Sequence, residues 1–259
     1  NNRSYRILFT GGGSGGPTTP LIALAQTLHE IEGVDCEFRF LGSRKGPERS
    51  MVEESGIPFH VIPSGKLRLY WHWRNLIAPL QVFAGLIAGA YHLLVFRPDV
   101  VVSAGSFVSV PVAWVCWLFR VPHLILQMDV RPGLANRLMS PFCRAVACHF
   151  EDTLRAFGGV ALRRVIGPVV RKIILEADPV EAEKQFGLDP RLPLLTVTGG
   201  GQGAQQLNKA VGGMLESWLT RWQVVHLTGS GNPGTGLQHQ HYHPVEFVGK
   251  GMGDLLARS

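Results

Sequence analysis

A glycine-rich loop follows the first apolar run of this chain, and it limits the fold more than any other feature. Residues 7–20 read Ile-Leu-Phe-Thr-Gly-Gly-Gly-Ser-Gly-Gly-Pro-Thr-Thr-Pro, the order expected of a strand, a loop and a helix. Glycine lets the backbone adopt positive φ and approach an anion, and a helix N-terminus offers unpaired N–H groups. The loop therefore predicts a diphosphate site. A dinucleotide fingerprint at Gly11, Gly13 and Gly16, or a tight turn without a ligand, fits the same residues.

A second loop of the same kind lies further along the chain. Residues 194–204 read Leu-Leu-Thr-Val-Thr-Gly-Gly-Gly-Gln-Gly-Ala. A chain of 259 residues is long enough for about two domains. We therefore predict an α/β protein with two Rossmann-like domains, each built on a parallel sheet, at residues 1–166 and 167–259. The run Gly-Pro-Val-Val-Arg at 167–171 is the expected crossing between them.

Apolar periodicity and turn residues place the remaining elements. Strands are expected at 36–41, 58–62, 100–103, 124–126, 144–148, 164–166, 194–197, 224–227 and 245–248. Helices are expected from the first loop to about residue 33, at 47–54, 76–96, 178–186, 205–218 and 252–258, and from about residues 111 and 132.

Composition favours an anionic partner. The net charge is +6 and the pI is near 9.4, but no basic-aromatic nucleic-acid motif is present, so we expect phosphorylated small molecules and an anionic membrane surface rather than nucleic acid. The cysteines (Cys36, Cys116, Cys143 and Cys148) show no C-x-x-C spacing and are predicted to be reduced thiols of a cytosolic protein. The first strand begins almost at once, so no signal segment is expected.

Residues 76–96 form an apolar run of 21 residues, preceded by a segment that mixes cations with aromatic rings. That length is enough to cross a bilayer, but a strand follows directly at 100–103. A core helix is a second interpretation. We favour a third, a helix on the membrane surface whose preceding loop dips into anionic headgroups. The residues of this predicted membrane patch are Lys66, Arg68, Tyr70, Trp71, Trp73 and Arg74.

Three further features suggest specific chemistry. Arg44 and Lys45 follow the second strand, where a reductase would bind the 2′-phosphate of NADP. Asp129 follows the strand at 124–126, where it is either a catalytic base or the cap of the next helix. Three histidines alternate at 239–243, which suggests a metal site, although a solvated loop is the simpler interpretation. The chain contains no Asp-x-Asp pair, so a metal-chelated nucleotide diphosphate is not expected, and we predict no metal and no other cofactor.

Several motifs resemble, in order, those of the MurG family of GT-B nucleotide-sugar glycosyltransferases, and they cover the whole chain. Besides the two glycine loops they are Phe-Leu-Gly-Ser-Arg-Lys-Gly-Pro-Glu at 40–48, Gly-Ile-Pro-Phe at 56–59, Ser-Gly-Lys-Leu-Arg at 64–68, Pro-Asp-Val-Val at 98–101, Val-Ser-Val-Pro at 108–111, Gly-Leu-Ala-Asn at 133–136 and the crossing at 167–171. The resemblance implies two α/β halves that face each other across a crevice.

The resemblance also implies an activity. The C4 hydroxyl of the MurNAc residue in undecaprenyl-diphosphate-MurNAc-pentapeptide (lipid I) attacks the anomeric carbon of GlcNAc, UDP leaves with inversion, and lipid II for peptidoglycan forms. UDP-GlcNAc is then a substrate, and the enzyme is peripheral on the cytoplasmic face of the cell membrane. The implied donor residues are Ser14, Gly15, Gly16, Asp129, Arg171, Gly200, Gly201, Gln202, Gly203, Ala204, Thr228, Gly229 and Val248. The implied acceptor side is Gly13, Pro17, Thr18, Ser106, Phe107 and Asn136.

The chain departs from the family pattern at four positions. Pro17 replaces a histidine, Phe107 a tyrosine, Asp129 an asparagine and Gly201 a serine. A carboxylate at Asp129 can take the proton of the attacking hydroxyl, so we expect it to be the catalytic base. Relatives continue beyond Ser259 into the ribose-binding part of the second domain, so we expect a fragment of a longer protein or one completed by a partner.

Two other functions stay open at this point. An NADP-dependent reductase would use the first loop with Arg44 and Lys45, but it leaves the second loop unexplained. A non-catalytic subunit that binds a lipid diphosphate at the membrane fits the same basic and apolar segments.

Overall fold

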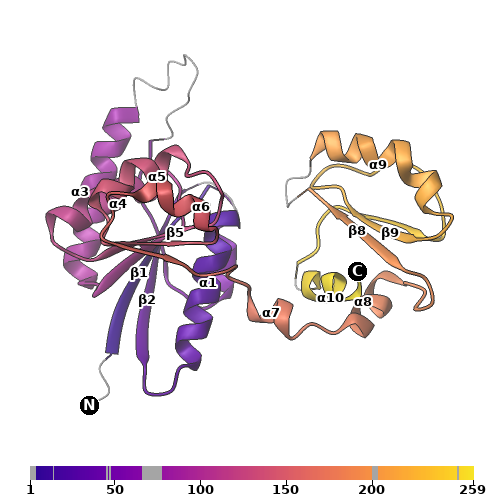
Figure 1. The fold of residues 1–259 in the computed structure, drawn as a ribbon, viewed down its shortest axis with the longest axis horizontal. Helices are drawn as coiled ribbons and strands as arrows, with labels where there is room; N and C mark the ends of the chain where they lie inside the picture. The colour runs from indigo at the N-terminus through magenta and orange to yellow at the C-terminus, as the bar shows by residue number, and fades with distance from the viewer. Residues whose placement is uncertain are drawn as a thin grey trace. The chain divides into compact units, whose positions relative to one another are not determined.

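The computed structural model describes residues 4–13, 15–44, 46, 48–65, 78–199, 204–249 and 251–259. The chain divides into two units, residues 1–170 and 171–259 (Figure 1). The predicted membrane patch at 66–74 lies outside the described residues, as do Ser14, Lys45 and residues 200–203 of the second loop.

The first unit alternates strands and helices along the chain, which is the pattern of a parallel sheet with crossover helices. Its elements are β1 (Ser4–Thr10), α1 (Gly15–Glu30), β2 (Asp35–Gly42), α2 (Glu48–Glu54), β3 (Phe59–Val61), α3 (Ala78–Phe96), β4 (Val100–Ser103), α4 (Ser109–Leu118), β5 (His123–Gln127), α5 (Leu134–Met139), η2 (Ser140–Phe142), β6 (Ala145–Cys148), α6 (Glu151–Leu154), η3 (Arg155–Phe157) and β7 (Leu162–Val165). The seven strands are parallel, in the order β3-β2-β1-β4-β5-β6-β7.

Side chains that alternate along β1 explain why both faces of this sheet are covered. Ile7 and Phe9 belong to the apolar cluster under α1 and α2, whereas Leu8 belongs to the cluster under α3 and α4. Phe9 and Leu8 are fully buried, and burial of each such side chain stabilises the fold by about 1.5–3 kcal/mol. The central strand is therefore anchored on both faces.

Helix α3 packs a narrow face against α4 and leaves its other face exposed. A Cβ on Gly85 would lie 2.6 Å from the carbonyl oxygen of Pro63, so glycine permits the close approach. On the exposed face of α3, large apolar side chains recur every three or four residues and are 59–69% exposed: Leu80, Phe83, Ile87, Tyr91 and Leu94. Within the described ranges α3 is the one helix long and apolar enough to span a bilayer, and 22% of residues 79–96 is buried. One face of α3 is therefore core-facing, through Leu93 and Phe96, and the rest of the helix is exposed.

The second unit contains α7 (Lys172–Leu175), α8 (Pro179–Phe186), β8 (Leu194–Thr198), α9 (Gln205–Trp218), β9 (Gln223–Leu227), β10 (Tyr242–Val245) and α10 (Met252–Arg258). Its three described strands are parallel, in the order β10-β9-β8. Figure 1 shows α9 on one side of this sheet, with α8 and α10 on the other. The predicted α/β organisation with two parallel sheets is thereby confirmed.

The expected strand at 245–248 is wrong, because the last described strand is Tyr242–Val245. Val248 is buried in the cluster that contains Leu255, whereas Phe247 is 64% exposed. The apolar run therefore spans the end of a strand and the turn after it. Pro244 is tolerated within β10 because this strand pairs on one side with β9 in the described sheet.

Candidate active site

The first glycine loop lies at the point where the strand order of the first sheet reverses. β2 and β3 extend to one side of β1, and β4 to β7 extend to the other. Ligands of open α/β sheets bind beyond the carboxyl ends of strands at such a switch point. Thr10 of β1 pairs in register with Ser103 of β4, so the loops that follow these residues leave the sheet side by side. The buried hydroxyl of Ser109 joins them, 3.1 Å from the Thr10 carbonyl oxygen and 3.2 Å from that of Gly105.

Glu48 shapes the first glycine loop, a role that sequence reasoning missed. Its carboxylate is fully buried, and Oε1 accepts hydrogen bonds from the backbone N–H of Gly13, at 2.9 Å, and from the hydroxyl of Ser43. Gly12 and Gly13 adopt φ of +154° and +82°, and a Cβ on Gly12 would lie 2.6 Å from Oε1. The second oxygen, Oε2, is buried without a hydrogen-bond partner among the described residues. In the sequence, the one indication of this role was that Glu48 ends the motif at 40–48.

Helix α1 begins at Gly15, directly beyond the first loop. Gly16 is exposed, and Gly15 and Pro17 are half-buried, so this turn reaches the surface. Pro17 has no backbone N–H, which leaves Gly15 and Gly16 as the N–H donors among the first three residues of the helix. Thr18, expected on the acceptor side, is fully buried with its side chain inside the unit.

The turn after β4 carries a strained serine. Ser106 has a φ of 98°, directly after Gly105 with a φ of 89°, and a non-glycine residue in this region costs of order 1–3 kcal/mol. Its hydroxyl oxygen accepts the N–H of Val108 at 3.3 Å. Phe107 is half-buried against the cluster beneath α4 and α5. Strain of this kind is concentrated at functional sites, which is consistent with the predicted acceptor side.

Asp129 lies at the carboxyl end of β5, where a buried pair of amides holds the chain beside it. Its side chain is exposed. Gln127, 1% exposed, donates through Nε2 to the carbonyl oxygen of Asp129 at 2.7 Å, and Asn136 Nδ2 donates to Gln127 Oε1 at 2.5 Å. The N-cap of α5 is Gly133, so the interpretation of Asp129 as a helix cap is wrong. Asn136, expected on the acceptor side, is buried in this network, and Gln127 was not predicted.

The second unit brings two more loops to one sheet edge. Thr198 of β8 is in register with Leu227 of β9, so the second glycine loop and the turn at Thr228 leave from adjacent strand ends. A Cβ on Gly199 would lie 2.8 Å from the backbone nitrogen of Ala204, so the start and the end of the loop lie against each other. Gly229 follows with a φ of 89°. The side chain of Val248 is in the core cluster of this unit.

Arg171 precedes α7 as its N-cap residue and is half-buried. Its Nε is buried without a hydrogen-bond partner among the described residues. A guanidinium with an unused donor is suited to an anionic group such as phosphate.

The predicted metal site finds no structural support in the part of the chain that is described. No group of three or more His, Cys, Asp or Glu residues there is placed to hold a metal ion. His239 is exposed, and its Nδ1 accepts the backbone N–H of His241 at 3.2 Å. Arg44 is exposed as well.

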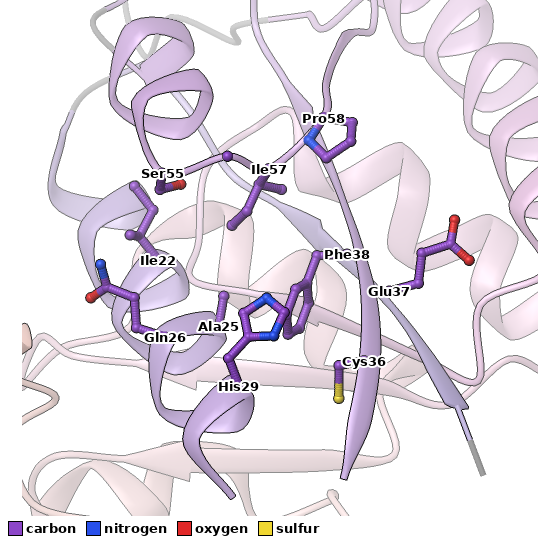
Figure 2. A pocket seen from close by; sticks show the side chains of 11 residues that line it. Ile22, Ala25, Gln26, His29, Cys36, Glu37, Phe38, Ser55, Ile57 and Pro58 are labelled. Atoms are coloured by element: carbon purple, nitrogen blue, oxygen red, sulfur yellow. The ribbon is translucent and has the colours of Figure 1, made fainter. Parts of the chain in front are cut away.

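A pocket of about 280 Å³ lies in the first unit between α1, β2 and the turn before β3 (Figure 2). His29 and Phe38, which both line it, meet edge to face with ring centroids 4.8 Å apart. Cys36 comes from the amino-terminal half of β2 and His29 from the last turn of α1, so the pocket lies toward the opposite end of these elements from the first glycine loop.

Comparison with known proteins identifies the family. The family model described as the glycosyltransferase family 28 N-terminal domain matches residues 7–148. A relative from Bacillus cereus, named UDP-N-acetylglucosamine–N-acetylmuramyl-(pentapeptide) pyrophosphoryl-undecaprenol N-acetylglucosamine transferase 2, is 35% identical over 255 residues, which is 97% of this chain and 71% of the relative. A Legionella pneumophila transferase of the same name without the numeral is 35% identical over 257 residues, 99% of this chain and 70% of its own length.

Solved structures show the same fold. Acinetobacter baumannii MurG superposes with a TM-score of 0.65 at 18% identity, over 97% of this chain and 71% of that one. A UDP-GlcNAc 2-epimerase from Neisseria meningitidis, bound to UDP-GlcNAc, has a TM-score of 0.67 at 10% identity and covers 99% of this chain and 76% of that one. The sequence relatives, rather than these structures, separate a transferase from an epimerase. The family model matches more than half of the chain, and relatives of 35% identity match nearly all of its length, so this chain belongs to glycosyltransferase family 28.

Proposed function

We propose that this protein transfers GlcNAc from UDP-GlcNAc to the C4 hydroxyl of MurNAc in undecaprenyl-diphosphate-MurNAc-pentapeptide, the step from lipid I to lipid II in peptidoglycan synthesis. The observation that carries the proposal is the 35% identity, over 97% of the chain, to a transferase named for these substrates. An NADP-dependent reductase is not supported by any of the relatives described above, and it leaves the second loop without a role.

The proposed reaction is a single displacement. The C4 hydroxyl attacks the anomeric carbon of GlcNAc, the bond to the UDP oxygen breaks, and UDP carries away the electron pair. Asp129 takes the hydroxyl proton, because it is an exposed carboxylate at a strand end of the switch-point region. No step in this scheme requires a metal, since backbone N–H groups at helix N-termini and a guanidinium can stabilise a leaving diphosphate.

The donor is assigned to the loops of the second unit. Gly200, Gly201, Gln202, Gly203 and Ala204 would hold the diphosphate, with Arg171 as its cationic partner. Thr228 and Gly229, with the backbone of Val248, would surround the nucleotide. These assignments rest on the family pattern and are supported by the shared sheet edge of the two loops and by the unused Nε of Arg171.

The acceptor is assigned to the first unit. Ser14, Gly15 and Gly16, which the family pattern includes among the donor residues, would face both the transferred sugar of the donor and the acceptor diphosphate, next to Gly13 and Pro17. Ser106 and Phe107 would form the opposite wall. The buried Thr18 and Asn136 would support this site from beneath rather than touch substrate, because neither side chain is exposed.

Transfer of radiolabel from UDP-GlcNAc to lipid I tests the proposal, with the complete reading frame that encodes this chain. We expect labelled lipid II and free UDP, and no label transfer when lipid I is omitted. Calorimetric titration with UDP and with NADPH gives an independent comparison. Binding of NADPH but not UDP, together with no transfer, would refute the proposal, whereas lipid binding without transfer would indicate the non-catalytic subunit.

We also infer that the exposed face of α3 rests on the membrane that holds the acceptor. Phe83, Ile87 and Tyr91 lie on this face, and Trp117 and Leu118 at the end of the neighbouring α4 are 61% and 66% exposed. Apolar side chains so exposed in water gain free energy when they enter the acyl boundary of a bilayer. The net charge of +6 adds attraction to anionic lipids.

The double variant Phe83→Ser/Ile87→Ser should therefore bind anionic vesicles more weakly, by about 10-fold to 100-fold in partition constant, because two apolar side chains no longer enter the bilayer. Sedimentation with phosphatidylglycerol vesicles measures this. Leu162→Ser/Leu175→Ser is the matched control, since both leucines are equally apolar and are 56% and 73% exposed on other elements. Equal loss of binding in the two double variants would contradict the assignment to α3.

A further inference from the structure

A chain of hydrogen bonds that begins at the half-buried Asn208 connects the helix after the second glycine loop with the turn after β9 in the second unit. Asn208 of α9 donates through Nδ2 to the carbonyl oxygen of Thr228 at 2.8 Å. Asn208 Oδ1 lies 3.1 Å from His226 Nε2, and His226 Nδ1 lies 3.1 Å from the hydroxyl of Tyr242. His226, Thr228 and Tyr242 are at most 5% exposed.

The geometry determines which atom donates in each bond. Asn208 uses its amide nitrogen on Thr228, so its Oδ1 is the atom that faces His226 and can only accept. His226 therefore carries its proton on Nε2, and Nδ1 accepts from the hydroxyl of Tyr242. Burial lowers the pKa of His226, which favours this neutral form. The side chain of Asn208 thus has one possible orientation.

Asn208 also closes the first turn of α9. Its backbone N–H donates to the carbonyl oxygen of Ala204 at 2.9 Å, and Ala204 is the last residue of the second loop. On the other side, Thr228 is held in place by its own hydroxyl, which donates to the carbonyl oxygen of Asn232 at 2.5 Å. One residue therefore fixes the end of one loop through its backbone and the start of the next through its side chain.

We propose that Asn208 is a positioning residue for the nucleotide-sugar donor, because it joins Ala204, the residue that ends the second glycine loop, to Thr228 at one fixed separation. This inference rests on the proposed function, which places the diphosphate and the nucleotide at these two loops. Asn208 itself does not touch the donor. It acts through Ala204 and Thr228, so its loss allows the two halves of the donor site to move apart.

The test compares two variants of Asn208 with a control at the opposite end of β9. Asn208→Ala removes both side-chain bonds, and Asn208→Asp keeps an acceptor for His226 but loses the donor to Thr228. We expect the KM for UDP-GlcNAc and the Kd for UDP to rise by about 10-fold to 100-fold in both, with the KM for lipid I unchanged. Gln223→Ala removes a more deeply buried amide, whose bonds go to the backbone of Asp189 and Leu192, and it should leave the donor KM unchanged.

Each outcome distinguishes this inference from the proposed function. If the unaltered protein does not transfer GlcNAc, the proposed function fails. If it does transfer, but the donor KM of Asn208→Asp stays within twofold of the unaltered value, Asn208 has no positioning role. A rise in donor KM that is equal in Gln223→Ala would also overturn the inference, because a general loss of packing would then explain the effect. Thermal unfolding shows whether each variant folds. If Asn208→Ala does not fold, the more conservative Asn208→Asp carries the test.

Discussion

Asp129→Asn is expected to lower kcat for GlcNAc transfer by about 10²-fold to 10⁴-fold, the range that a positioned general base contributes. An amide of the same shape cannot take the proton of the attacking hydroxyl. The fold should be unaffected, because the Asp129 side chain is exposed and the N-cap of α5 is Gly133. The KM for UDP-GlcNAc should change little.

Asp152→Asn is the control for this experiment. Asp152 is an exposed carboxylate in α6 of the same unit, so its loss removes the same charge without touching the strand end of β5. Initial rates of label transfer under saturating lipid I give kcat for both variants. If Asp129→Asn retains normal turnover, Asp129 is not the base, and the family's usual asparagine at this position would point to another proton acceptor.

Glu48→Ala is expected to destabilise the first unit by about 2 kcal/mol, because it removes the acceptor that two hydrogen bonds share and leaves a cavity. The N–H of Gly13 and the hydroxyl of Ser43 lose their shared partner, Oε1 of Glu48. The first loop should then lose its fixed shape, and we expect the KM for lipid I to rise about 10-fold while the KM for the donor stays constant. Urea unfolding and transfer kinetics measure the two effects.

Two substitutions make this prediction specific. Glu48→Gln keeps an oxygen in the place of Oε1 and should retain most of the acceptor affinity. Glu53→Ala removes a carboxylate from the same helix whose partner is the exposed Arg49, and exposed pairs of this kind contribute little, about 0.5 kcal/mol or less. A Glu48→Ala protein with normal acceptor KM would show that the loop keeps its shape without this carboxylate.

The sequence by itself was sufficient for the class of fold and for most element positions. Strand, glycine loop and helix follow one another twice, and the bounds of α9 and α10 agree with the apolar periodicity. Such patterns are local, since a helix or strand with one buried face repeats every 3.6 or 2 residues. The motifs were also sufficient to indicate the glycosyltransferase family, because their order survives along the whole chain.

The partners of the buried polar groups were decided by the tertiary structure alone. Glu48 meets Gly13 across 35 residues, and His226 meets Asn208 across 18. The helical and strand periodicities of the sequence do not predict such pairs, because the parallel topology determines which strand ends become neighbours. The same holds for α3: its composition is apolar all round, so the sequence did not say which face would pack on α4 and which would stay exposed. Val248 was assigned to a strand because an apolar run looks alike in a strand and in a buried turn.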